Sequence, residues 1–275
     1  MSRRAVALSM AGAILVVACT SPGGAPTTTP TPEPTASPNP VELTVYAAAS
    51  LKGALEAVKS AYETADPGTT LTISTDSSAA LKTQIEQGAP ADVFLSADTK
   101  NPQALVDAGL TDGAAVDFAG NKLVVIVPTG DPAGIETPAD LATPGVAIIA
   151  AGDAVPITKY ANQLVENLAK EPGYPADFAA AYQANIVSRE DNVKAVVAKL
   201  ELGEGDAAIV YVTDAKISTK VASVEVPDSA NVVATYAGVV VKATQNPEAA
   251  AAFLTWLAGP EGQAILSGFG FLPPS

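Results

Sequence analysis

Residues 41–62 read VELTVYAAASLKGALEAVKSAY, and two periodicities meet in this stretch. Val41, Leu43 and Val45 alternate with polar residues, which predicts a β-strand that runs on into three alanines. From Ser50 onward the apolar residues recur at helical spacing, so we expect a helix to begin there. The residues with this spacing are Leu51, Ala54, Leu55, Val58, Ala61 and Tyr62. A buried strand that passes directly into a helix is typical of α/β folds.

The same alternation of strand and helix continues towards the C-terminus. Further strands are expected near 71–73 and at 92–96, 123–127, 146–150, 207–212 and 237–241. Further helices are expected from about 79 and 192, and at 158–169 and 247–258. Short strands separated by helices predict mostly parallel sheets flanked by helices, and the length beyond residue 40 suffices for two such lobes.

The first forty residues are expected to lie outside this fold. Arg3 and Arg4 precede an uncharged run at 5–18, which is too short for a stable membrane span and suits a signal-peptide core. The run ends in LVVAC at Cys19, which resembles a bacterial lipoprotein processing site whose cysteine becomes the lipidated first mature residue. The alternative is an ordinary signal peptide with an incidental cysteine. Thirteen of the 21 residues in Thr20–Pro40 are Pro or Thr, which predicts an extended spacer.

Charge and composition exclude several classes of function. Asp and Glu number 29 against 15 Lys and Arg, giving a net charge of −14, which argues against a nucleic-acid partner. The chain has no His and one Cys, so His-dependent triads, zinc sites of Cys or His, and an intrachain disulfide are excluded. The glycine-rich GEGDAA at 203–208 precedes a strand instead of joining strand to helix, so a dinucleotide site is not expected. Without the leader, Arg189 is the single arginine.

Two kinds of residue mark the ends of the predicted strands. Five aspartates lie near turns or helix starts, where capping is a more common role than metal binding or acid/base chemistry: Asp76, Asp92, Asp98, Asp153 and Asp191. Ser50, Ser77, Ser78 and Val193 stand where helices are expected to begin after strands or turns. Ligands of open α/β sheets lie at the carboxyl ends of strands, and helix N-termini there favour anions. Plain N-capping is the alternative for each serine.

An ordered series of motifs resembles the periplasmic molybdate-binding proteins of ABC transporters, which are type II solute-binding proteins. The motifs are VYAAASL at 45–51, QIEQGAPADVFLSAD at 84–98, NKLVV at 121–125, EDNV at 190–193, IVY at 209–211, GPEGQ at 259–263 and FGF at 269–271. The resemblance implies a periplasmic-binding-protein-like fold, in which two α/β lobes joined by two hinge crossovers close on an oxyanion. We expect a lipoprotein signal peptide at 1–18, lipidated cysteine and linker at 19–40, lobe 1 at 41–123 plus 227–275, and lobe 2 at 124–226.

The resemblance also implies which residues bind the oxyanion. Hydroxyl groups or backbone N–H groups are assigned to Ser50, Ser78, Ile157, Val193 and Tyr211. Ser77 is an alternative to Ser78, and Tyr211 is alternatively a strand-end aromatic with a solvated hydroxyl. The family has a small residue in place of Ile157, whose contact is through the backbone. Asp76 would repel a dianion unless its side chain faces away or caps a helix.

The function that the resemblance implies is capture of molybdate or tungstate by an extracytoplasmic lipoprotein, which delivers it to the permease of an ABC importer. The protein is expected to be a monomer anchored to the membrane through Cys19, without enzyme activity or cofactor. No metal is coordinated directly, because molybdenum is bound as its oxyanion. The alternatives are the same fold binding sulfate or an organic anion, and an extracellular α/β enzyme. Molybdate is a fully ionised dianion that offers only acceptors, so neutral donors suffice to hold it.

Overall fold

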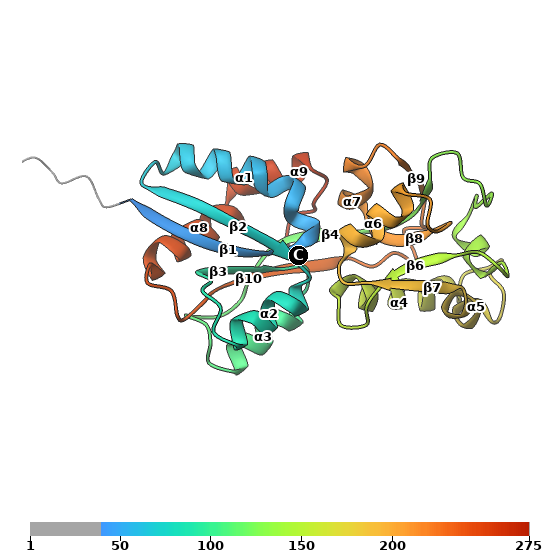
Figure 1. Cartoon of the computed structure of the whole chain (residues 1–275), viewed down its shortest axis with the longest axis horizontal. Coiled ribbons are helices and arrows are strands. Elements are labelled where there is room, and N and C mark those ends of the chain that lie inside the picture. The colour runs from blue at the N-terminus through green and yellow to red at the C-terminus, as the bar shows by residue number, and fades with distance from the viewer. Residues whose placement is uncertain (1–39, 275) are drawn as a thin grey trace, which may run out of the picture. The chain divides into compact units, whose positions relative to one another are not determined.

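The computed structural model describes residues 40–274, and Figure 1 shows their helices and strands. The predicted signal peptide, the lipidated Cys19 and the linker up to residue 39 lie outside the described residues. The strands are β1 (Val41–Ala48), β2 (Thr69–Asp76), β3 (Val93–Ser96), β4 (Val116–Asn121), β5 (Leu123–Pro128), β6 (Ile148–Ala151), β7 (Ile186–Glu190), β8 (Ala208–Tyr211), β9 (Val221–Val224) and β10 (Ala234–Val240).

Helices follow most of these strands, as expected of an α/β chain. The α-helices are α1 (Lys52–Ala65), α2 (Ser78–Glu86), α3 (Lys100–Asp107), α4 (Pro156–Leu168), α5 (Phe178–Ala184), α6 (Val193–Glu201), α7 (Val212–Ile217), α8 (Pro247–Ala258) and α9 (Pro260–Gly268). Two 3-10 helices are η1 (Ala49–Leu51) and η2 (Pro138–Ala142).

The strands form two groups, which we call lobe 1 and lobe 2. Lobe 1 has a five-stranded sheet in the order β2-β1-β3-β10-β4, and lobe 2 has a three-stranded sheet β8-β5-β9 and a two-stranded sheet β6-β7. The chain leaves the first sheet at Lys122, between β4 and β5, and returns to it between β9 and β10. The exact lobe boundaries given above stay a prediction.

The sheets are mixed, whereas the spacing of strands and helices predicted mostly parallel ones. The pairs β1–β2, β1–β3 and β6–β7 are parallel, as strand–helix–strand units require. β10 runs antiparallel to β3 and β4, and β5 runs antiparallel to β8 and β9. Both β5 and β10 begin directly after the chain crosses between the lobes, so no covering helix sets their direction.

Helix α1 shows how sequence periodicity is converted into packing. Ala54, Leu55, Val58 and Tyr62 on one of its faces are buried, and the Tyr62 ring meets Phe253 of α8 edge-on at 5.0 Å between centroids. Full burial of a Leu, Val or Phe side chain contributes about 1.5–3 kcal/mol.

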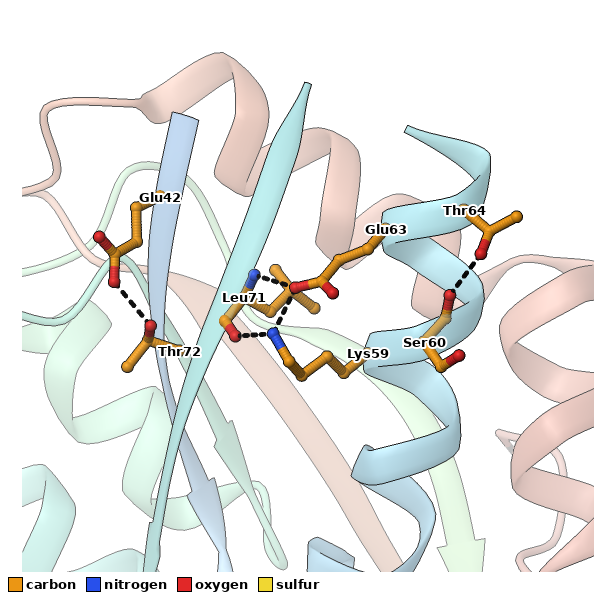
Figure 2. A network of polar contacts seen from close by, with 7 residues as sticks. All are labelled: Glu42, Lys59, Ser60, Glu63, Thr64, Leu71 and Thr72. Atoms are coloured by element: carbon orange, nitrogen blue, oxygen red, sulfur yellow. Dashed lines mark hydrogen bonds and ion pairs between the residues drawn. The ribbon is translucent and has the colours of Figure 1, made fainter. Parts of the chain in front are cut away.

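Two polar side chains of α1 hydrogen-bond to the backbone of the edge strand β2 at Leu71. Glu63 accepts a hydrogen bond from the Leu71 N–H at 2.8 Å, and Lys59 donates to the Leu71 carbonyl, as Figure 2 shows. Lys59 also pairs with Glu63, and these contacts lower the pKa of the Glu63 carboxyl. The N–H and C=O groups of Leu71, which would otherwise stay open at the sheet edge, are thereby occupied.

Candidate oxyanion-binding site

A small cavity lies at the carboxyl ends of β1, β2 and β8, and residues of both lobes line it. Its volume is about 10 Å³, close to the smallest space that holds one water, so it is far too small for a sugar or an amino acid. Its lining includes all five residues predicted to bind the oxyanion, and consists of Ala49, Ser50, Ser77, Ser78, Val155, Pro156, Ile157, Asn192, Val193 and Tyr211. Neither Lys nor Arg is among them.

Three helices begin at this cavity. α2 starts at Ser78, α4 at Pro156 and α6 at Val193. The first N–H groups of a helix have no partner within the helix, and the helix dipole makes that end positive. Because Pro156 has no N–H, Ile157 is the first residue of α4 that can donate. Three N-termini that meet at one small cavity form an environment for an anion without any formally charged side chain.

Local capping explains why α2 and α6 begin where they do. Ser77 caps α2 by accepting the Ala80 N–H at 3.4 Å, and Asn192 caps α6 by accepting the Ala195 N–H at 3.1 Å. Ser78 is held differently, because its Oγ accepts the Ala97 N–H at 3.0 Å and leaves the hydroxyl proton free to donate. Both serines line the cavity, so the preference for Ser78 as ligand stays a prediction.

Tyr211 ends β8 with a buried hydroxyl that has no hydrogen-bond partner among the described residues. Its side chain is 1% exposed, so the alternative of a solvated strand-end hydroxyl is wrong. Burial raises the pKa of Tyr211 well above its ordinary value, so the group stays protonated and can donate. A buried donor without a partner costs about 1–3 kcal/mol, and an acceptor in the cavity would recover that cost.

The structure shows how two unusual residues are accommodated at this site. The Ile157 side chain is 2% exposed and packs in the core, so its size does not obstruct the donation expected of its backbone. Asp76 lines a wider outer cleft of about 660 Å³ instead of the small cavity. There Asp76 accepts the Ser77 N–H at 2.7 Å and the side-chain amide of Asn192 at 3.1 Å. The second bond joins the two lobes beside the cavity, and both contacts account for the carboxylate without placing it against the ligand.

Three of the other aspartates make hydrogen bonds or an ion pair with nearby residues. Asp98 accepts the Asn101 N–H at 3.0 Å at the start of α3, and Asp92 accepts the Thr44 N–H at 2.7 Å. Asp153 pairs with Arg189 at 3.1 Å. Among residues 40–274, no three acidic, His or Cys residues are grouped so as to hold a metal ion.

A polar cluster behind Ser50 was not foreseen from the sequence. Ser50 Oγ lies 2.8 Å from the hydroxyl of Tyr236, which in turn lies 3.4 Å from the side-chain nitrogen of Asn121. The same nitrogen donates to Thr213 at 2.8 Å. All four side chains are buried, although they lie up to 186 residues apart in the chain. No local sequence pattern signals such a cluster.

Comparison with known proteins places the chain in a class. Residues 43–272 match the family described as bacterial extracellular solute-binding protein, and the chain belongs to that family. The prediction of a binding protein instead of an enzyme is thereby confirmed. Within the part of the chain that the structure describes, no helix combines the length and apolarity needed to cross a bilayer.

Individual relatives sharpen the comparison. The chain is 35% identical over 233 residues to the molybdate-binding protein ModA of Mycobacterium tuberculosis, covering 84% of this chain and 85% of that protein. It is 31% identical over 239 residues to ModA of Escherichia coli, covering 84% and 88%. The periplasmic molybdate-binding protein of Azotobacter vinelandii superposes with a TM-score of 0.70 at 26% identity, covering 85% of this chain and all of that one. The resemblance to this group and the two-lobed fold class are confirmed.

Proposed function

We propose that this protein captures molybdate outside the cytoplasm and delivers it to the permease of an ABC importer, with tungstate as a second ligand of the same geometry. Ser50, Ser78 and Tyr211 would donate hydroxyl protons, and Ile157 and Val193 would donate backbone N–H groups. The protein would act as a monomer, tethered to the membrane by lipid on Cys19 and held away from it by the Pro/Thr-rich linker.

The observation that carries the proposal is the character of the cavity. It is small and lined by neutral donors, and Tyr211 in its lining has a hydroxyl without a hydrogen-bond partner among the described residues. A ligand that fits must be compact and must accept hydrogen bonds from several directions, as a tetrahedral dianion does. Relatives at 31–35% identity are named for molybdate binding, which supports this choice among such anions.

The donors are numerous enough for tight binding. A hydrogen bond to a charged group contributes roughly 1.5–3 kcal/mol, so five such contacts give about 8–15 kcal/mol before costs. Further N–H groups add to this, whereas desolvation and lobe closure reduce it. A net value of about −8 to −12 kcal/mol corresponds to a dissociation constant between micromolar and nanomolar.

The acidic surface makes selectivity depend on the cavity itself. The outer cleft contains Asp76, Asp153, Glu190 and Asp191 with Arg189 as its single basic residue. An anion that approaches is therefore repelled until it reaches the helix N-termini, and added salt should speed association by screening this repulsion.

Isothermal titration calorimetry of the purified protein with molybdate, tungstate, sulfate and phosphate tests the ligand. We expect one site, bound tightly by molybdate and tungstate and weakly by phosphate. Tight binding of sulfate without molybdate would favour the sulfate alternative, because sulfate is equally deprotonated but smaller. Absence of heat with molybdate and tungstate would refute the proposal.

Membrane fractionation tests the anchor separately. The native protein should sediment with membranes, and Cys19→Ala should leave it in the soluble extracytoplasmic fraction because no lipid can be attached. Equal membrane association of both proteins would contradict lipidation at Cys19.

A further inference from the structure

Two serines of the cavity have another group placed directly behind the hydroxyl oxygen. Ser78 Oγ accepts the Ala97 N–H at 3.0 Å, so the Ser78 hydroxyl proton must be donated to a different group. Ser50 lies 2.8 Å from the Tyr236 hydroxyl, and either oxygen of that pair could be the donor. The group behind Tyr236 decides which one donates.

That group is the side-chain amide of Asn121. Its Nδ2 donates to Tyr236 Oη at 3.4 Å and to Thr213 Oγ1 at 2.8 Å. Asn121 and Tyr236 are both fully buried, so water does not compete for these bonds. A hydroxyl has one proton, and Tyr236, which accepts from Asn121 on one side, gives that proton to Ser50 on the other.

Packing holds the Tyr236 ring in this position. Its ring meets those of Tyr211, Phe271 and Phe118 edge-on, at 5.7, 5.5 and 6.2 Å between centroids. Phe271 belongs to the FGF motif at 269–271, which the oxyanion site itself does not use. Edge-to-face contacts on several sides fix the ring, so its hydroxyl points steadily at Ser50.

Resting on the proposed function, we propose that Tyr236 is a positioning residue that determines specificity by making Ser50 an obligate donor toward the cavity. The Tyr236 proton occupies a lone pair of Ser50, which directs the Ser50 proton at the ligand. Ser78 is oriented in the same way by Ala97, and Tyr211 keeps its own proton. No hydroxyl of these three then faces the ligand as an acceptor. A protonated oxyanion such as hydrogen phosphate brings a proton that finds no acceptor among these three hydroxyls, whereas molybdate and sulfate bring none.

The test is Tyr236→Phe, which removes the hydroxyl and keeps the ring. Ser50 can then rotate and accept a proton from the ligand. We expect molybdate and sulfate to bind about tenfold more weakly, with phosphate unchanged or tighter in competition, so the molybdate-to-phosphate ratio falls about tenfold. Tyr62→Phe is the matched control, because Tyr62 is 3% exposed, packs against α8 and does not line the cavity. It should leave the ratio unchanged.

A double-mutant cycle shows whether Tyr236 acts through Ser50. In a Ser50→Ala background, Tyr236→Phe should change molybdate affinity by less than about twofold, because the hydroxyl it orients is gone. Asn121→Leu, which removes the donor behind Tyr236, should shift the ratio in the same direction as Tyr236→Phe. If phosphate does not displace molybdate from either the wild type or Tyr236→Phe, the ratio cannot be measured and the double-mutant cycle decides the proposal.

The outcomes separate this inference from the proposed function. If the wild-type protein does not bind molybdate, the proposed function fails. If the wild-type protein binds molybdate, two results would refute the positioning role of Tyr236. One is that Tyr236→Phe leaves both the molybdate affinity and the molybdate-to-phosphate ratio unchanged. The other is that Tyr236→Phe weakens molybdate binding by the same factor in the wild-type and Ser50→Ala backgrounds.

Discussion

Removal of the Tyr211 hydroxyl should change ligand affinity and protein stability in opposite directions. The hydroxyl is buried and lacks a hydrogen-bond partner among the described residues, and the Tyr211 side chain lines the cavity. In the proposed complex it donates to a dianion, and such a bond contributes roughly 1.5–3 kcal/mol. Tyr211→Phe should therefore weaken molybdate binding by about 10- to 150-fold.

The unliganded protein should respond differently to the same substitution. Its unpartnered hydroxyl carries a desolvation cost of about 1–3 kcal/mol, which a phenylalanine of the same shape does not. The free energy of unfolding of the apo variant should therefore equal or exceed that of the wild type, by up to about 3 kcal/mol. Most binding-site substitutions that weaken binding by disrupting structure would instead lower this free energy.

Calorimetry with molybdate and urea unfolding without ligand measure the two quantities on one preparation. Tyr62→Phe, which removes a hydroxyl from the core of lobe 1, controls for loss of a tyrosine hydroxyl in general. Unchanged molybdate affinity in Tyr211→Phe would refute the contact. A clear loss of apo stability would show that the hydroxyl has a partner in the free protein, and would refute the reasoning from its isolation.

Two further predictions concern other buried polar groups. Ser50→Ala and Ser78→Ala should each weaken molybdate binding by about 1–3 kcal/mol in the same titration, and unchanged affinity in both would refute the site. Asp214 is fully buried beside Lys194 at 2.8 Å, and burial raises its pKa above 3.8 despite that lysine. A raised folded-state pKa favours the native state at low pH, and this contribution is lost as pH rises above 3.8 towards the folded value. Asp214→Asn should therefore gain stability relative to the wild type in urea unfolding as pH rises above 3.8, and a pH-independent difference would contradict this.

Periodicity was a good guide to elements whose ends carry their own signals. Helix α8 spans Pro247–Ala258 as expected, because a proline opens it and Gly259 follows it. Strand β5 spans Leu123–Pro128, one residue beyond the expected 123–127. Strands β4, β7 and β9 were not anticipated, because their sequences show no clear apolar–polar alternation. The direction of each strand relative to its neighbours could not be predicted either, because periodicity indicates which residues are buried and not how neighbouring strands run.

The residues of the candidate site likewise differ in how well the sequence predicts them. Ser50, Ser78 and Val193 follow strands or caps that the sequence reveals, and Tyr211 came from a motif. The hydrogen-bonded groups behind them did not, because Tyr236 in β10 and Asn121 at the end of β4 lie just outside the strands predicted at 237–241 and 123–127, and the NKLVV motif gave Asn121 no role in the site. Only the fold brings them to Ser50. The residues that line the cavity were therefore predictable, and the buried polar groups behind Ser50 were not.

The central claim is that neutral donors at three helix N-termini hold the oxyanion. A crystal structure of the molybdate complex, with molybdenum located by its anomalous scattering, tests it most directly. We predict one molybdenum peak in the cavity, with its oxygens within hydrogen-bond distance of the Tyr211 hydroxyl and the N–H groups of Ile157 and Val193. A peak outside this cavity, or oxygens held chiefly by lysine or arginine side chains, would contradict the account.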